Sequence, residues 1–333
     1  MKKSILFVFL LSFFVACAPE TTVPILTRTA QPTDLIPTGL MHNTAVPTRV
    51  DIPEMNEKVL VVSQGNYFIA DLDGSAPVLL YSAEMEPLTM ASLSSDKTKF
   101  AYFKNNFLYV LDIARQATIA LNQDIIGSIG GNLRWSPDEK KLAMTCSNSQ
   151  HPSNSICQID AQSGQIEFLL NQSDTDQFCS VNYMAFFDWS NDGTTMVYTC
   201  FIVPEKGQKQ AFAIYLYDIA SKTSSRIFDS SLQDSIWYLH STSLSPNNKY
   251  LLVSGAGQTP IDQVFLLDLT TNNMRQLTSG SEYHSDAFVW RIDGDSFYLH
   301  KTMIQSPYTE SNFVMDTNGE VLFPVDVDGA IIE

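Results

Sequence analysis

The stretch WSPDEKKLAM, at residues 135–144, places a large aromatic residue, a polar turn and an apolar run in immediate succession. Ser136, Pro137 and Asp138 are residue types that favour tight turns, and the apolar run after them suits a β-strand. The same order of residue types occurs in five segments, which align without a gap: LSSDKTKFAYFK from Leu93, WSPDEKKLAMTC from Trp135, WSNDGTTMVYTC from Trp189, LSPNNKYLLVSG from Leu244 and WRIDGDSFYLHK from Trp290. We therefore interpret the stretch as a repeated strand–turn–strand unit, with Trp135 packed between neighbouring units, and not as a catalytic group of Ser, Asp and Lys.

A third apolar stretch follows each of these turns and ends in aspartate. Its six copies are YFIADL, LYVLDI, ICQIDA, IYLYDI, VFLLDL and NFVMDT, and their aspartates are separated by 41, 48, 58, 50 and 48 residues. Turn residues and a fourth short apolar run, such as PVLLYS or IEFLL, come next. Four strands per unit and a period of about 40–50 residues are typical of β-propeller blades.

A ring of blades is favoured because one twisted blade cannot bury both of its faces, whereas a closed ring buries them and protects the strand edges. We predict an all-β fold, a six-bladed β-propeller of four-stranded antiparallel blades over residues 56–333, in preference to two domains. The first unit begins near Val59 with its second strand and lacks an innermost strand. The residues after Phe323 are the candidate for that strand, although they could pair with another edge of the first blade.

The amino terminus predicts export and a lipid anchor. Lys2 and Lys3 precede an apolar run over residues 5–16, which is shorter than the about 20 residues that a membrane-spanning helix needs. Cys17 directly follows FVA and resembles the lipidated cysteine of a bacterial lipobox. We expect a lipoprotein signal peptide at residues 1–16 and acylation of Cys17. An ordinary signal peptide and an uncleaved anchor are the alternatives.

Residues 17–55 are dense in Thr and Pro and show no sustained hydrophobic period. Such a segment has no apolar face to bury, and proline favours extended conformations. We expect a disordered tether that holds the propeller on the extracytoplasmic side of the bacterial cell envelope, with no assignment to an inner or outer membrane.

The chain is acidic, with 36 Asp and Glu residues against 20 Lys and Arg residues. No basic stripe is present, so nucleic acid is not an expected partner, and membrane contact is expected through the lipid anchor only. The acidity itself mainly favours solubility. The sequence requires no cofactor.

The repeats WSPDEKKLAM with ICQIDAQSGQ, and LSPNNKYLLV with VFLLDLTTNNMRQLT, resemble the WD-type repeats of the TolB propeller family. The resemblance extends from about Lys58 to the end of the chain. It implies a six-bladed propeller but not one activity. The family includes partner-binding proteins, propellers joined to prolyl oligopeptidase domains, and metal-dependent pectate-type lyases with His-rich metal sites.

Four cysteines besides Cys17 lie in the propeller, and disulfides persist in exported proteins. Cys146 ends the second strand of its blade and Cys157 lies in the adjacent third strand, so we predict that they are bonded. Cys179 and Cys200 would then form a second disulfide around the next blade's inner strand. Buried free thiols are the alternative. No close cysteine spacing favours zinc.

One face of the propeller is the better candidate for function. The connections between strands two and three, and between blades, share this face, which we call the loop face; the short hairpin turns lie on the opposite turn face. Function tends to sit on irregular loops held by a rigid scaffold. The irregular connections are SNSQHPSNS, IVPEKGQKQ, GAGQTPID and MIQSPYTES. We expect the ligand-binding face to include Tyr183, Trp237, Tyr238, His240, Tyr283, His284, Asp286, His300 and Tyr308.

The segment EYHSDAF places Glu282, His284 and Asp286 on one side of a strand, because side chains alternate. Together with His240 from the neighbouring blade, they could line the mouth of a central channel. The candidate metal ligands are therefore His240, Glu282, His284, Asp286 and His300. The alternative is a set of polar residues at a wet channel entrance, where Trp237, Tyr238 and Tyr183 could form an aromatic platform for a sugar or a peptide.

The sequence lacks a nucleophile elbow, an H-E-x-x-H motif and a phosphate-binding G-x-x-x-x-G-K loop. DLDG at Asp71 and DVDG at Asp326 resemble parts of a calcium loop but lack its distant glutamate, so we interpret them as turns. The favoured function is binding of an envelope or extracellular protein, peptide or glycan without catalysis. The alternatives are a metal-dependent lyase or hydrolase acting on an extracellular polysaccharide or peptide, and a structural scaffold of an envelope complex.

Overall fold

The structure is a computed structural model. It describes residues 57–82, 88, 90–105, 107–122, 126–127, 132–147, 155–170, 179–180, 186–202, 211–232, 236, 238–257, 259–306 and 308–332. The chain divides into two units, Met1–Asp51 and Ile52–Glu333, and every described residue belongs to the second. The predicted signal peptide, Cys17 and the predicted tether lie outside the described residues. In the described ranges, no helix has the length and apolar character needed to span a membrane.

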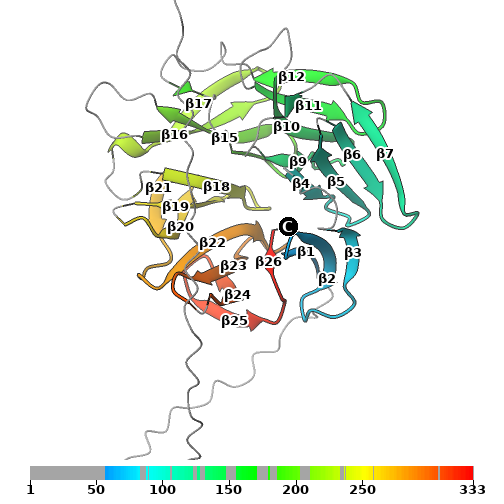
Figure 1. The fold of residues 1–333 in the computed structure, drawn as a ribbon. Coiled ribbons are helices and arrows are strands. Elements are labelled where there is room, and N and C mark those ends of the chain that lie inside the picture. The colour runs from blue at the N-terminus through cyan, green and yellow to red at the C-terminus, as the bar shows by residue number, and fades with distance from the viewer. Residues whose placement is uncertain are drawn as a thin grey trace, which may run out of the picture. The chain divides into compact units, whose positions relative to one another are not determined.

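Six antiparallel sheets form the blades of a β-propeller, as the repeats predict (Figure 1). Blades 1, 2, 5 and 6 have four strands each. From the innermost strand outward, blade 1 contains β26 (Ala330–Ile331), β1 (Lys58–Ser63), β2 (Asn66–Asp71) and β3 (Val78–Tyr81). Blade 2 contains β4 (Met90–Leu93), β5 (Lys99–Lys104), β6 (Phe107–Asp112) and β7 (Ala117–Asn122). Blade 5 contains β18 (Tyr238–Leu244), β19 (Tyr250–Ala256), β20 (Asp262–Asp268) and β21 (Asn273–Gln276), and blade 6 contains β22 (Tyr283–Trp290), β23 (Ser296–Met303), β24 (Glu310–Asp316) and β25 (Val321–Val325).

Blades 3 and 4 each have an innermost strand in two pieces, which the repeat pattern did not predict. Blade 3 contains β8 (Ile126–Gly127), β9 (Leu133–Trp135), β10 (Lys141–Ser147), β11 (Ser155–Asp160) and β12 (Ile166–Leu170). Blade 4 contains β13 (Cys179–Ser180), β14 (Phe187–Trp189), β15 (Thr195–Ile202), β16 (Ala211–Asp218) and β17 (Thr223–Asp229), followed by a 3₁₀ turn, η2 (Ser230–Leu232). Both inner pieces pair with the same second strand, so the blade remains one sheet.

The WSPD stretch forms the predicted hairpin turn. The Ser136 hydroxyl donates to the Asp138 carboxylate at 2.7 Å, and the amide of Glu139 donates to the Ser136 carbonyl at 2.8 Å. The bond from Ser136 is the main reason that the pKa of Asp138 lies below its usual value. The serine hydroxyls of the equivalent turns bond in the same way to Asp96, Asp192 and Asn247. The serine and the acid or amide are therefore structural parts of the turn.

Hairpin turns of neighbouring blades also contact one another on the turn face. Glu139 accepts hydrogen bonds from the Ser95 hydroxyl and the Asp96 amide of the preceding blade. Asn248 accepts a bond of 3.0 Å from the amide of Asn191, and Asn247 donates one of 3.0 Å to the carbonyl of Gly294. These contacts join successive turns and make the turn face a rigid support.

Hydrophobic residues fill each seam between neighbouring blades, giving six core clusters for six seams among the described residues. Trp135 lies in the seam between blades 2 and 3, as predicted, where its indole N–H donates to the carbonyl of Ser92 at 3.3 Å. Trp290 makes the equivalent bond of 2.9 Å to the carbonyl of Ser243. The indole nitrogen of Trp189 is buried without a hydrogen-bond partner, and nothing in the structure explains that difference.

The carboxyl-terminal residues close the ring, as predicted. Strand β26 pairs with the inner edge of β1 through Val61 with Ile331 and Val62 with Ala330. One buried side chain holds the segment that leads into β26, because the Asn312 amide donates to the carbonyls of Val327 at 3.1 Å and Gly329 at 2.8 Å. Closure therefore joins the two ends of the propeller sequence.

The predicted disulfide between Cys146 and Cys157 is present, with a Cα–Cα distance of 6.1 Å. It links β10 to β11 within blade 3, which are adjacent strands. Cys200 is also disulfide-bonded. Strand β13, which contains Cys179, pairs with β15, which contains Cys200, but the pairing of these two cysteines with each other stays a prediction.

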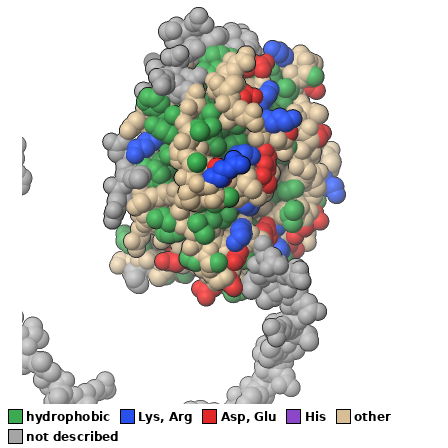
Figure 2. Space-filling view, turned by 90° about the vertical axis from the view of Figure 1, so that its right-hand side faces the viewer, with side chains coloured by type: hydrophobic (Ala, Val, Ile, Leu, Met, Phe, Trp, Pro, Cys, Tyr) green, Lys and Arg blue, Asp and Glu red, His purple; other side chains and the backbone are tan. Residues whose placement is uncertain are grey.

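The surface in Figure 2 shows hydrophobic, basic and acidic side chains interspersed on one face of the molecule. Exposed apolar residues of the outer strands include Val78 and Leu79 on β3 and Ile119 on β7. The excess of acidic residues in the composition therefore does not produce a surface of one sign on this face.

Candidate functional site

Strands β18, β20 and β22 bring together four ionisable side chains at the loop face. His240 from β18 lies 2.7 Å from Asp286 of β22, measured from its Nε2 to the carboxylate. Asp262, the first residue of β20, lies 2.8 Å from Nδ1 of His284 and 3.9 Å from Nδ1 of His240. We call His240, Asp262, His284 and Asp286 the His–Asp cluster. It crosses the seam between blades 5 and 6.

All four side chains of the His–Asp cluster are reachable from solvent but sheltered. Their exposed fractions are 22% for His240, 24% for Asp262, 35% for His284 and 20% for Asp286. Electrostatic interactions are stronger in such partly buried surroundings than on an open surface. The cluster therefore combines access for a partner with charges that water screens only in part.

The hydrogen bonds determine what each histidine of the cluster offers. Both ring nitrogens of His240 face carboxylates, and carboxylates only accept hydrogen bonds, so the surroundings favour donation from His240. Nδ1 of His284 lies near the Asp262 carboxylate at 2.8 Å and the Asp262 amide at 3.2 Å. Because the Asp262 amide donates to this nitrogen, the two contacts hold the imidazole ring of His284 against Asp262.

The surroundings of Asp286 change the protonation of its carboxyl. Burial raises the pKa of the Asp286 carboxyl, and the neighbouring Asp262 carboxylate raises it further. The positive charge that His240 can carry acts in the opposite direction, as do those of His300 and His284. Burial prevails, so the Asp286 carboxyl holds its proton more tightly than an exposed aspartate does.

An aromatic surface adjoins the cluster. The Tyr238 side chain at the start of β18 is 40% exposed. Its ring is stacked near Phe201 at a centroid distance of 6.4 Å and meets the ring of His240 edge-on at the same distance. An exposed ring beside charged and hydrogen-bonding groups is a common arrangement for contacting a sugar or a peptide.

His300, another residue predicted for this face, pairs with Asp286 in the sheet of blade 6. His300 is buried, with Nδ1 at 3.0 Å from Asn312 and Nε2 at 3.2 Å from Thr302. Because the Asn312 amide nitrogen donates to two carbonyls, its oxygen accepts from Nδ1–H of His300. His300 therefore contacts the residue that holds the closing segment, and its role in ligand binding stays a prediction.

The remaining predicted residues are dispersed. Glu282 is exposed and precedes the strand that carries His284 and Asp286, Tyr283 is half-buried opposite Met303, and Tyr308 is 75% exposed in a connection of blade 6. Tyr183 and Trp237 lie outside the described residues. Most residues of the irregular connections SNSQHPSNS and IVPEKGQKQ lie outside them as well.

Sequence reasoning missed Asp262, which joins the two histidines. Its only sequence signal is its position at the end of the irregular connection GAGQTPID, where the third strand of blade 5 begins. A residue at such a position lies at the same end of the blade as the start of the inner strand. The irregular connection was therefore the feature of the sequence that could have identified Asp262.

For the His–Asp cluster, metal binding stays a prediction. Its imidazoles and carboxylates are directed at one another, and the described part of the chain contains no group of three His, Cys, Asp or Glu side chains arranged to hold a metal ion. The arrangement can instead donate and accept hydrogen bonds and present charge to a bound molecule.

The opposite end of the inner strands has a more enclosed polar pair. Asp188 accepts hydrogen bonds from the amides of Trp189 at 2.9 Å and Leu244 at 2.8 Å, with Arg134 at 4.0 Å. Burial raises the pKa of the Asp188 carboxyl. Because backbone donors from two blades already satisfy this carboxylate, the pair serves to hold the inner strands in place.

Comparison with known proteins gives one matching family. Residues 127–309, more than half of the chain, match the model of the prolyl oligopeptidase N-terminal β-propeller domain. No protein with a curated description matches the chain.

Solved structures share the fold at low sequence identity. TolB from Acinetobacter baumannii is 17% identical with a TM-score of 0.60, over 82% of this chain and 64% of that chain. An oligogalacturonate lyase in complex with manganese is 14% identical with a TM-score of 0.53, over 80% of this chain and 71% of that chain. The oligogalacturonate lyase of Vibrio parahaemolyticus is 11% identical with a TM-score of 0.52, over 81% of this chain and 72% of that chain. The chain thus spans 64% of the TolB chain, and these similarities establish a TolB-like propeller fold and no activity.

The electrostatic description of the cluster predicts opposite responses to two substitutions. Asp262→Asn should lower the pKa of the Asp286 carboxyl, because it removes a neighbouring negative charge. His240→Gln should raise that pKa, because it removes a favourable positive charge while keeping a hydrogen-bonding side chain of similar length. Titration of the Asp286 carboxyl by ¹³C NMR measures both changes. Shifts of the same sign in the two variants would contradict the arrangement.

Proposed function

We propose that this chain, a member of the family of prolyl oligopeptidase N-terminal β-propeller domains, is an extracytoplasmic lipoprotein. Its propeller binds a protein, peptide or glycan partner without catalysis. The observation that carries the proposal is the joining of an exposed aromatic ring, Tyr238, to the His–Asp cluster at the loop face. Two blades contribute to this surface, so the closed ring positions it.

Binding is favoured over catalysis by the hydrogen bonds of the cluster. A general base needs a free nitrogen within reach of the proton that it removes, and His240 has carboxylates beside both nitrogens. His284 is oriented by Asp262 in the manner of a catalytic histidine, and the hydrogen bonds found for it among the described residues go to Asp262 and not to a nucleophilic side chain. The sequence also lacks the nucleophile motifs considered above.

The anchoring part of the proposal rests on the sequence. The amino terminus has the order that lipid modification requires: two lysines, an apolar run as short as that of a lipoprotein signal peptide, and then Cys17. A Thr- and Pro-rich segment follows and leads to the propeller. A single acyl chain anchors only weakly, whereas several chains anchor stably. A lipidated Cys17 would thus retain the propeller at a membrane surface, where it meets envelope or extracellular partners.

Substitution of Cys17 tests the anchor. In the full chain, Cys17→Ser should abolish incorporation of an alkyne-labelled fatty acid and move the protein from the membrane fraction to the soluble fraction. Cys157→Ser, which removes a different cysteine, should keep both the label and the membrane fraction. A Cys17→Ser protein that still incorporates the label would show that the acyl chain is attached elsewhere.

Site-specific photocrosslinking tests the binding surface. A benzophenone amino acid at position 238 of the full chain should crosslink a partner in intact cells, because the Tyr238 side chain is 40% exposed beside the cluster. The matched control is position 292, where Ile292 is 88% exposed in a hairpin of the turn face. Asp286→Asn should weaken the adduct at position 238. Adducts at position 292 but none at position 238 would place the binding surface on the turn face.

A further inference from the structure

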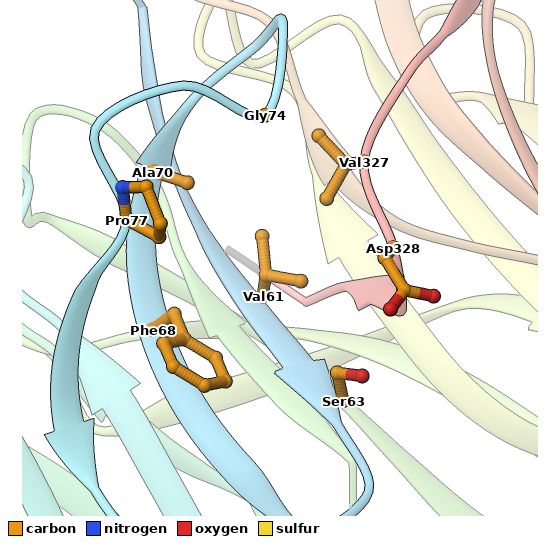
Figure 3. Close-up of a pocket in the computed structure, with 8 residues that line it drawn as sticks. All are labelled: Val61, Ser63, Phe68, Ala70, Gly74, Pro77, Val327 and Asp328. Atoms are coloured by element: carbon orange, nitrogen blue, oxygen red, sulfur yellow. The ribbon is translucent and has the colours of Figure 1, made fainter.

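A pocket lies where the two ends of the propeller sequence meet (Figure 3). It has a volume of about 240 Å³ and lies apart from the His–Asp cluster, with which it shares no residue. We call it the closure pocket; its lining residues are Val61, Ser63, Phe68, Ala70, Gly74, Pro77, Val327 and Asp328. The first blade contributes six of them and the carboxyl-terminal segment contributes the other two, so the pocket exists only in the closed ring.

The closure pocket has apolar walls and a polar side. Figure 3 shows Val61, Phe68 and Val327 around the space, with the Asp328 carboxylate and the Ser63 hydroxyl on one side of it. Val61 is buried and Phe68 is half-buried, whereas Asp328 is exposed. A ligand would therefore contact aliphatic and aromatic carbon inside the pocket and meet a negative charge at its opening.

Close backbone contacts make the walls of the pocket rigid. Gly74 has a φ of +74°, and a Cβ at this position would lie 2.6 Å from the carbonyl oxygen of Asp326. Gly329 has a φ of +119°, and its Cβ would lie 2.4 Å from the carbonyl oxygen of Val62. The two D-x-D-G sequences noted above thus meet here, and their glycines permit the approach. A preformed pocket of this kind binds with little ordering cost.

The charges around the opening are negative. Asp73, Asp326 and Asp328 are all exposed, and hydrogen bonds from Ser75 hold the pKa of Asp73 below its usual value. Among the described residues, no Lys, Arg or His lines the pocket. The nearby Lys58 is bonded to Asp71 at 2.8 Å. The surroundings therefore favour a positively charged group at the opening.

We propose that the closure pocket binds a lysine side chain presented by a partner protein. The volume is below the about 300–1,000 Å³ of typical small-molecule pockets and suits one side chain. The four methylenes of lysine would lie against Val61, Phe68 and Val327, and the ammonium group would lie near Asp328. A calcium ion does not suit the pocket, because only one of the described residues that line it carries a carboxylate.

Peptide titration of the full chain tests the proposal, with valine methyl groups labelled for NMR. The probe is the capped tripeptide Gly-Lys-Gly, and the control is Gly-norleucine-Gly, which keeps the aliphatic stem and lacks the charge. The lysine peptide should shift the methyl signals of Val61 and Val327 and bind roughly threefold to fivefold more tightly than the control, as expected for an exposed charge pair. Asp328→Asn should remove this preference, whereas Glu310→Gln, an exposed acid outside the pocket, should retain it.

Four results would overturn the proposal. Equal binding of the lysine and norleucine peptides would remove the role of charge, and unchanged Val61 and Val327 signals would remove the pocket. Tighter binding of free butylammonium than of the lysine peptide would assign the pocket to a small amine. Calcium chloride that shifts the same signals more strongly than the peptide would assign the aspartates to a metal ion. Because this pocket is separate from Tyr238, each result leaves the crosslinking test of the proposed function unaffected.

Discussion

Closure of the ring by the two residues of β26, Ala330 and Ile331, is the constraint on which the rest of this structure depends. Each blade buries its two faces against its neighbours, so five complete seams leave two apolar faces exposed until the sixth forms. That last seam contains Val59 and Val61 from one end of the propeller sequence and Val325 and Ile331 from the other. The most distant parts of the sequence must therefore meet before the core is complete, which makes this seam the costliest contact in chain entropy.

Asn312 connects the closure to the rest of blade 6. Its amide binds the carbonyls of Val327 and Gly329, and its oxygen accepts from His300, whose neighbour on the inner strand is Asp286. The positive charge that His300 can carry acts on the Asp286 carboxyl, so an electrostatic interaction links these hydrogen bonds to the His–Asp cluster. The closure pocket and the cluster lie in different seams, yet both have their geometry set by the same closed ring.

Much of the fold could be predicted from the sequence because it depends on repetition. WSPDEKKLAM and its equivalents predict the hairpins, and the missing strand before Val59 predicts the closure. The adjacent strands that contain Cys146 and Cys157 predict the disulfide between them. The proximity of His240 to Asp286 follows from equivalent positions at the start of two neighbouring inner strands.

The remaining features depend on contacts that no repeat encodes. Asp262 joins the cluster through an irregular connection whose path the repeat does not define. Strand alternation predicts the side of the strand on which the His300 side chain lies. It does not predict that the closing segment and Asn312 bury this side chain. The closure pocket arises from the approach of Gly74 to Asp326, two residues that lie far apart in the sequence. Each of these depends on tertiary packing, which strand periodicity cannot report.

Hydrogen exchange at the amide of Ile332 tests the central role of the closure most directly. This amide donates to the carbonyl of Leu60 in β1 at 2.9 Å, directly after the closing strand β26 of blade 1. Asn312→Ala should cost about 2–4 kcal/mol, because it leaves buried polar groups unpaired, and should reduce protection at Ile332 and throughout β1. Asn273→Ala, at an exposed position of β21, is the control and should leave protection unchanged. Equal protection of Ile332 in the two variants would contradict the account and show that the ring does not depend on this closure.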